Sequence, residues 1–142
     1  MKKILFLFCL VNVLNTSAQD LLEIDDHLLF RFSQSQLDDI ASVNPNQIKY
    51  LNFYLNNSYY FRDAGIIPDQ KLKDYQDIFE YLSLPSEYQL EEPINKDNFN
   101  ILMFNVPFFE NKSTAYLFGD SNLLLVLRSK KVINEMFNEY YY

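Results

Sequence analysis

Apolar side chains recur every three or four positions after residue 33, which is the spacing of an amphipathic helix. Ser33 followed by Gln36 forms a capping box, in which each end of the pair satisfies a backbone N–H of the first turn. We therefore expect a short helix to begin after Ser33. Its buried stripe consists of three apolar residues, Leu37, Ile40 and Ala41.

A second helix is predicted over residues 45–56. Asn44 is a good N-cap residue, and Pro45 stands at the first helical position, where its missing N–H costs nothing. Asn57 closes the pattern, and the aromatic run over residues 58–62 then indicates a strand.

Two other segments carry patterns that fit more than one element. Residues 21–32 have apolar positions at helical spacing and also an alternating set near their end; a helix is the favoured interpretation. Residues 72–82 predict a third helix that ends before Pro85. A strand over residues 78–84 competes with that helix, and the pattern does not decide between them.

The C-terminal third of the chain is rich in β-branched and aromatic residues. Strands are expected over residues 99–106, 114–118 and 123–128. The turn residues 119–122 join the last two strands into an antiparallel hairpin. Because residues 123–127 are continuously apolar, we expect a central strand that is covered on both faces.

A last helix is expected after Ser129, which can cap it. Its inward-facing positions are four apolar residues, Val132, Ile133, Met136 and Phe137. The three tyrosines at 140–142 form either a frayed end or an aromatic plug on the domain, and the plug is favoured. Together these elements predict an α+β domain: an antiparallel sheet of about three to five strands, a C-terminal meander, packed against N-terminal helices and a C-terminal helix.

Residues 1–18 have the pattern of a secretory signal peptide. Lys2 and Lys3 form a positive head, an apolar run follows over residues 4–14, and small residues end at Ala18. The run is about half of the roughly 20 residues that a membrane-spanning helix needs, and no longer run follows. We expect cleavage after Ala18, which leaves one globular domain over residues 19–142 and no integral membrane segment.

Charge and cysteine content then narrow the functional classes. Cleavage removes Lys2 and Lys3 but no acid, so the formal net charge changes from −7 to −9. Such a chain repels phosphate backbones, which argues against nucleic acid as a partner. Cys9, the only cysteine, lies in the leader, so disulfides and thiolate chemistry are excluded from the mature domain. These features, with the wealth of Asn, Lys, Ile, Phe and Tyr, resemble exports of Gram-negative bacteria, periplasmic or extracellular.

The inventory of catalytic side chains is small. Gly65 and Gly119 are the only glycines and lie far apart, so a glycine-rich phosphate loop is excluded. His27 is the only histidine and follows Asp25 and Asp26, which suggests a metal or acid–base site. No third ligand is evident nearby. We therefore predict no catalytic residue, no metal site and no cofactor.

Two candidate binding surfaces remain. On the helix over residues 45–56, Tyr50, Phe53 and Tyr54 form a second apolar face opposite the core stripe. That face is either covered by another element, which is the favoured interpretation, or displayed as a binding surface. The second candidate is an anion site formed by Arg128, Lys130 and Lys131 at the start of the last helix.

The leading functional hypothesis is a small exported binding or protein-interaction module that is not an enzyme. It would act on an unknown protein or small ligand through aromatic surface and edge strands. One alternative is a metal- or carboxylate-dependent hydrolase that uses Asp25, Asp26 and His27. Another is a structural subunit of a surface assembly.

Overall fold

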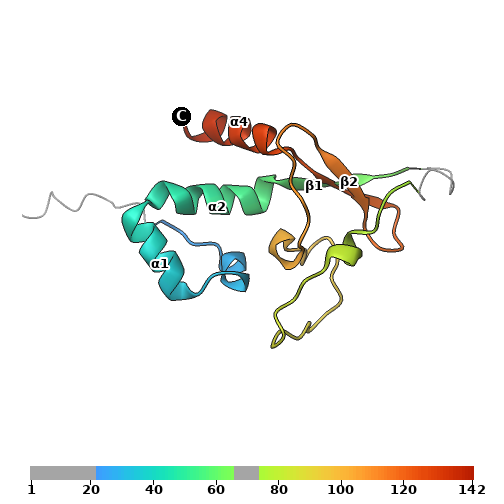
Figure 1. The fold of residues 1–142 in the computed structure, drawn as a ribbon, viewed down its shortest axis with the longest axis horizontal. Helices are drawn as coiled ribbons and strands as arrows, with labels where there is room; N and C mark the ends of the chain where they lie inside the picture. The colour runs from blue at the N-terminus through green and yellow to red at the C-terminus, as the bar shows by residue number, and fades with distance from the viewer. Residues whose placement is uncertain (1–21, 66–73) are drawn as a thin grey trace, which may run out of the picture.

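The computed structural model describes residues 22–65 and 74–142. The expected signal peptide lies outside the described residues. Figure 1 shows α2 and β1 following one another along the long axis of the molecule. The helices and strands of the described chain are α1 (Gln34–Val43), α2 (Pro45–Asn57), α4 (Lys130–Tyr141), β1 (Tyr59–Asp63), β2 (Thr114–Leu117) and β3 (Leu123–Leu127), with three short 3₁₀ helices η1 (Asp26–Phe30), η2 (Ile78–Tyr81) and η3 (Ile101–Met103).

The three strands form one antiparallel sheet in the order β1-β3-β2, so the α+β class is confirmed, at the low end of the predicted strand count. β2 and β3 form the predicted hairpin, with Thr114 opposite Leu127 and Leu117 opposite Leu124. Gly119 in the connecting turn has a φ of +58°, a backbone conformation that glycine adopts without steric cost.

β3 is the central strand, as its apolar sequence predicts. Successive side chains of a strand point to opposite faces of the sheet. The neighbours Leu124 and Leu125 are both buried, which confirms that both faces are covered at this point. On the Leu125 face, the sheet meets a set of aromatic rings from three segments, Phe61, Phe99, Phe104 and Phe118.

The two N-terminal helices begin where their caps predict. Both halves of the Ser33–Gln36 capping box are formed. α2 begins at Pro45, although the Asn44 side chain makes no capping hydrogen bond. α2 contacts α4 on one side and α1 and η1 on the other (Figure 1). Leu37 of α1 and Ile48 of α2 are fully buried in the main core.

The expected third helix over residues 72–82 is wrong for its described part, residues 74–82. This part forms only the single turn of η2 and isolated bridges. The reason is a set of hydrogen bonds to the hairpin: the Asp77 carboxylate accepts from the N–H of Phe79 and of Gly119, and the Gln76 carbonyl accepts from the N–H of Leu117. These bonds hold the chain extended beside β2. The competing strand over residues 78–84 is also absent, apart from the bridge of Leu82 to Phe104.

The expected strand over residues 99–106 is likewise wrong. Residues 101–103 form η3, and Phe104 makes one bridge to Leu82. The side chain of Asn100 accepts from the Leu102 N–H, which closes a tight turn in place of a ladder. The described part of the segment over residues 21–32, residues 22–32, is helical only over η1, a short 3₁₀ helix whose buried residue is Leu28.

The last helix begins at the predicted cap, because the Ser129 hydroxyl accepts from the Val132 N–H. Ile133 and Phe137 are buried as expected, whereas Val132 is exposed. In the tail, the Tyr141 ring packs on Phe137 with a centroid distance of 4.7 Å, while Tyr140 and Tyr142 are largely exposed. The plug is therefore formed mainly by Tyr141. No helix among the described residues has the length and apolar character needed to cross a bilayer.

Candidate functional site

The aromatic face of α2 is covered by α4 and by the segment before β2. The Phe53 ring lies 5.4 Å from that of Phe137 and is only 7% exposed. Tyr50 packs on Phe137 and donates its hydroxyl to the Asn134 side chain at 2.9 Å. Tyr54 packs on Phe108, and burial raises the pKa of its phenol, with the Tyr50 charge adding to the effect. The covered alternative is confirmed, so Phe53 is inaccessible to a partner while α4 is docked.

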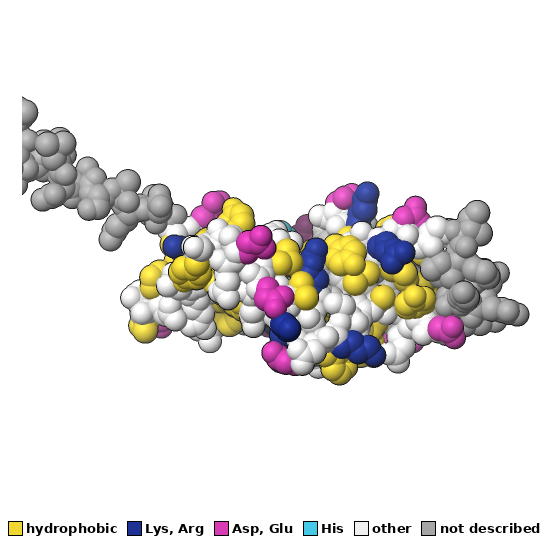
Figure 2. All heavy atoms as spheres, turned by 90° about the horizontal axis from the view of Figure 1, so that it is seen from above, with side chains coloured by type: hydrophobic (Ala, Val, Ile, Leu, Met, Phe, Trp, Pro, Cys, Tyr) yellow, Lys and Arg dark blue, Asp and Glu magenta, His cyan; other side chains and the backbone are white. Residues whose placement is uncertain are grey.

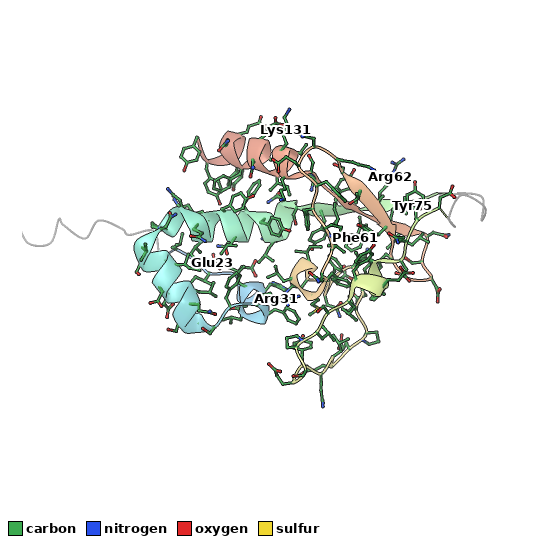
Figure 3. All side chains as sticks on the ribbon, in the orientation of Figure 1. Glu23, Arg31, Phe61, Arg62, Tyr75 and Lys131 are labelled. Carbon is green, nitrogen blue, oxygen red and sulfur yellow. The ribbon has the colours of Figure 1, made fainter. Side chains whose placement is uncertain are left out.

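The cations at the start of α4 do not come together as an anion site. The Arg128 guanidinium donates to the carbonyls of Asn57 and Tyr59, at 2.6 and 2.9 Å, and lies over the Tyr60 ring. The backbone N–H groups of Lys130 and Lys131 already donate to the carbonyls of Phe109 and Glu110. The Arg128 guanidinium and these two N–H groups therefore already donate hydrogen bonds within the fold. The Lys131 side chain points outward (Figure 3) and lies 3.8 Å from Glu135.

The Asp25–Asp26–His27 segment forms the start of η1. Asp25 is its N-cap: one carboxylate oxygen accepts from the His27 N–H at 2.9 Å and lies 2.8 Å from the His27 ring nitrogen Nδ1. This cap geometry brings residues two apart together. α2 anchors the segment, because the Asp25 N–H donates to Asn52 and the Asn56 amide reaches the second carboxylate oxygen.

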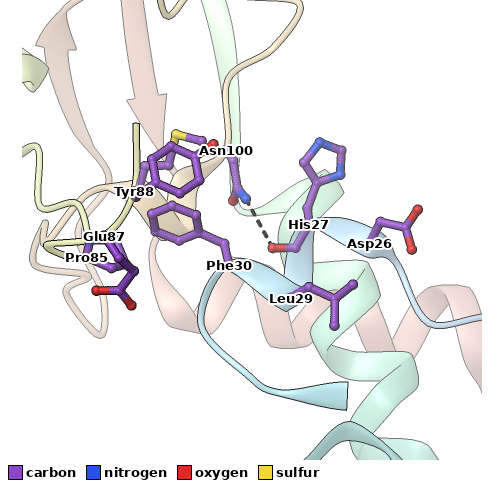
Figure 4. Close-up of a pocket in the computed structure, with 9 residues that line it drawn as sticks. Asp26, His27, Leu29, Phe30, Pro85, Glu87, Tyr88 and Asn100 are labelled. Atoms are coloured by element: carbon purple, nitrogen blue, oxygen red, sulfur yellow. Dashed lines mark hydrogen bonds between the residues drawn. The ribbon is translucent and has the colours of Figure 1, made fainter. Parts of the chain in front are cut away.

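This arrangement favours the ionised form of Asp25. Burial acts to raise the pKa of its carboxyl group, but hydrogen bonds from the His27 backbone and ring and from Asn56 outweigh that effect. The net pKa of Asp25 lies below its ordinary value of 3.8. Asp26, by contrast, is exposed and extends beside the His27 ring (Figure 4).

A hollow of about 500 Å³ lies between η1 and the loop that follows η2. Two of its lining residues, Phe30 and Tyr88, have their rings side by side in Figure 4, and these rings pack edge to face with centroids 5.0 Å apart. The Asn100 amide donates to the His27 carbonyl at 3.1 Å and so ties η1 to the segment behind it. The wall combines five apolar and four polar residues: Leu29, Phe30, Pro85, Tyr88 and Met103 with Asp26, His27, Glu87 and Asn100.

Two further hollows adjoin the first. One, of about 550 Å³, shares Asp26 and His27 with it and extends toward Asn52 and Asn56 of α2. The other, of about 220 Å³, shares Tyr88 and Met103 and extends along the loop toward Ile94. We call these three hollows together the η1 groove.

The apolar wall of the η1 groove was not evident from the sequence. Leu29 is 45% exposed and Tyr88 39%, although both are large apolar side chains. Leu29 lies in the short 3₁₀ helix η1 and Tyr88 in an irregular loop, so neither segment is long enough in one conformation for a period to mark an exposed face. The nearest signal was Asp26 and His27, which do line the groove. Tyr50, Phe53, Tyr54, Arg128, Lys130 and Lys131 are not among the lining residues of its three hollows.

The groove lacks a site of the kind that binds a transition metal. Within residues 22–65 and 74–142, no three His, Cys, Asp or Glu side chains converge closely enough to hold an ion.

None of the protein-family models, curated proteins or solved structures compared with this chain matches it. The function must therefore be argued from the groove itself.

Proposed function

We propose that this protein is a non-enzymatic binding module that takes a large apolar group into the η1 groove. The observation that carries the proposal is the exposed pair Leu29 and Tyr88 in the wall of a hollow of about 500 Å³. Ligand sites in proteins are typically hollows of about 300–1,000 Å³, mostly apolar, with a few placed polar groups. Asp26 and His27, which are exposed, supply such groups here.

Export is part of the same proposal. The signal peptide expected over residues 1–18 supports it, and the cysteine-free domain is consistent with a periplasmic or extracellular site in a Gram-negative bacterium. Outside the cytosol, a small module with an apolar groove would act by holding a ligand or another protein.

Replacing Leu29 with serine is expected to weaken binding of an uncharged apolar dye, Nile red, by about three- to tenfold. The substitution removes apolar surface worth about 1 kcal/mol or more from the wall of the groove. A fluorescence titration of the purified protein measures the affinity. Val43→Ser is the matched control, because Val43 is an exposed aliphatic residue at the end of α1, 85% exposed and not among the lining residues of the groove. Equal affinities of the two variants would place the dye elsewhere and overturn the proposal.

A hydrolase is the second candidate, and the 2.8 Å contact of Asp25 with the His27 ring favours it. A carboxylate on one imidazole nitrogen orients the ring and leaves the other nitrogen to act as a base. Among the described residues, the three hollows have no Ser, Thr or Cys in their lining, so a nucleophile would have to be one of the carboxylates or a water molecule.

We expect ethyl butyrate, an unactivated ester, to be hydrolysed at the same rate by the wild-type protein and by His27→Ala. A pH-stat measures the acid released. Equal rates at the level of buffer support a binding module, because they show that the acid–base pair performs no turnover. A wild-type rate that clearly exceeds both buffer and His27→Ala would instead support the hydrolase.

A further inference from the structure

The described charged side chains that line the η1 groove are acidic, apart from His27. Within residues 22–65 and 74–142, its three hollows are lined by six carboxylates, Glu23, Asp25, Asp26, Glu87, Glu91 and Glu92, and by no lysine or arginine. Among the described residues, Asp25 is the only one of the six that pairs with a basic side chain. A hollow with low-dielectric apolar walls and charges of one sign concentrates the field and attracts the opposite charge.

Two cations stand near the groove without lining it. The Arg31 guanidinium donates to the carbonyls of Leu102 and Ser83 and lies over the Phe30 ring, and Lys96 stands in the chain between the lining residues Ile94 and Asn98. These two charges offset part of the field, while six carboxylates line the groove itself. Lys131, with Arg128 and Lys130 near it in the chain, lies on the α4 side of the molecule, across α2 from Arg31 (Figure 3). On that side, Lys and Arg side chains lie among the acidic ones (Figure 2).

The apolar part of the groove limits the partner further. A simple cation would gain nothing from Leu29, Phe30 and Tyr88, whereas an apolar ligand without charge would gain nothing from the acidic rim. Three hollows in a row suit an extended chain better than a compact molecule.

We infer that the groove binds an extended peptide segment in which lysine or arginine alternates with large apolar side chains. An apolar side chain enters the hollow between Leu29 and Tyr88, and the flanking basic side chains meet Asp26 on one rim and Glu87 on the other. This inference rests on the proposed function, which it deepens by assigning the chemistry of the partner.

Three acetylated and amidated peptides of sequence X-Leu-X-Phe-X, with X as Lys, Gln or Glu, test the inference by isothermal titration calorimetry on the full protein. We expect the Lys peptide to bind at least about tenfold more tightly than the Gln peptide, and the Glu peptide to bind most weakly. The difference should shrink as salt is raised toward 1 M, where the Debye length is about 3 Å. Leu29→Ser should weaken binding of both the Lys and the Gln peptide.

A double variant, Asp26→Asn with Glu87→Gln, separates the rim from the net charge of the protein. This variant should bind the Lys peptide about tenfold more weakly than the wild type does, and it should bind the Gln peptide with unchanged affinity. The matched control is Asp39→Asn with Glu139→Gln, which makes the same chemical changes at exposed positions on α1 and α4, away from the lining residues. Equal losses in the two double variants would show a non-local charge effect and overturn the inference.

Two other outcomes distinguish this inference from the proposed function. If the Lys and Gln peptides bind equally well and both respond to Leu29→Ser, the groove is a binding site without charge selectivity, and only the inference falls. If Nile red binds in the groove but no peptide does, the inference of a peptide partner is wrong, and the proposal of a binding module is still supported. If neither the dye nor any peptide binds, both fall.

Discussion

Replacing Phe137 with alanine is expected to lower the free energy of unfolding by about 3–5 kcal/mol, the usual cost of removing a buried phenylalanine side chain. The Phe137 ring packs against those of Tyr50, Phe53 and Tyr141, with centroids 4.7–5.4 Å away, and a fourth ring, that of the exposed Tyr142, lies farther off at 6.4 Å. Its loss leaves a cavity between α2 and α4 and exposes Phe53. Because a domain is stabilised by only about 5–15 kcal/mol, this change is large.

Urea denaturation followed by circular dichroism measures the effect. Tyr142→Ala is the control, since Tyr142 stands in the same helix end but is 85% exposed, and it should change stability by less than about 0.5 kcal/mol. A Phe137→Ala protein as stable as the wild type would mean that α4 does not cover α2. The aromatic face would then be accessible, as the alternative interpretation of the sequence had it.

The second large effect is expected at Asn100, which is 4% exposed and joins η1 to η3 behind the groove. Its side chain donates to the His27 carbonyl and accepts from the Leu102 N–H, at 3.1 and 2.9 Å. Asn100→Ala leaves both backbone groups without this bond, and a buried unsatisfied group costs about 1–3 kcal/mol. We expect a loss of about 2–4 kcal/mol, together with weaker binding of Nile red because η1 is no longer held in place.

Asn100→Asp refines the test, because aspartate keeps the acceptor for the Leu102 N–H and loses the donor to His27. The stability of this variant should lie between those of the wild type and Asn100→Ala, and its affinity for Nile red should still be lower than that of the wild type. Asn46→Ala, on the exposed face of α2, is the control and should be neutral. An Asn100→Ala protein with unchanged stability and unchanged dye affinity would show that this hydrogen-bonded tie does not position the groove.

The elements that the sequence predicted correctly are those decided by neighbouring residues. α1 and α4 follow from the caps Ser33 and Ser129, α2 follows from Pro45 at its first position, and each helix has apolar residues at helical spacing. The hairpin of β2 and β3 follows from a turn that contains Gly119. In each case the hydrogen bonds that define the element lie within a few residues, so a local pattern contains the needed information.

The segments that were predicted wrongly are decided by distant partners. Asp77 bonds to Gly119, and Arg31 bonds to the carbonyls of Leu102 and Ser83. These contacts hold residues 74–106 in irregular conformations that no helix or strand period describes. Propensity is a weak guide in such segments, because tertiary contacts override it.

The candidate site was only partly predictable for the same reason. Asp26 and His27 were candidates from the sequence because the single histidine follows two aspartates, and both residues line the groove. Leu29 and Tyr88 come from segments almost sixty residues apart, and only the fold brings them to one hollow. The aromatic residues of α2 were conspicuous in the sequence, but the matching apolar stripe of α4 covers them.

The most direct test of the central claim, that the η1 groove is the ligand site, is a titration of the ¹⁵N-labelled protein with Nile red followed by ¹H–¹⁵N correlation spectra. The account predicts progressive shifts of the Leu29, Phe30 and Tyr88 amide signals, with the Ile133 and Phe137 signals of α4 unchanged. Shifts confined to α4, or no shifts at a concentration of dye that saturates its fluorescence, would contradict it.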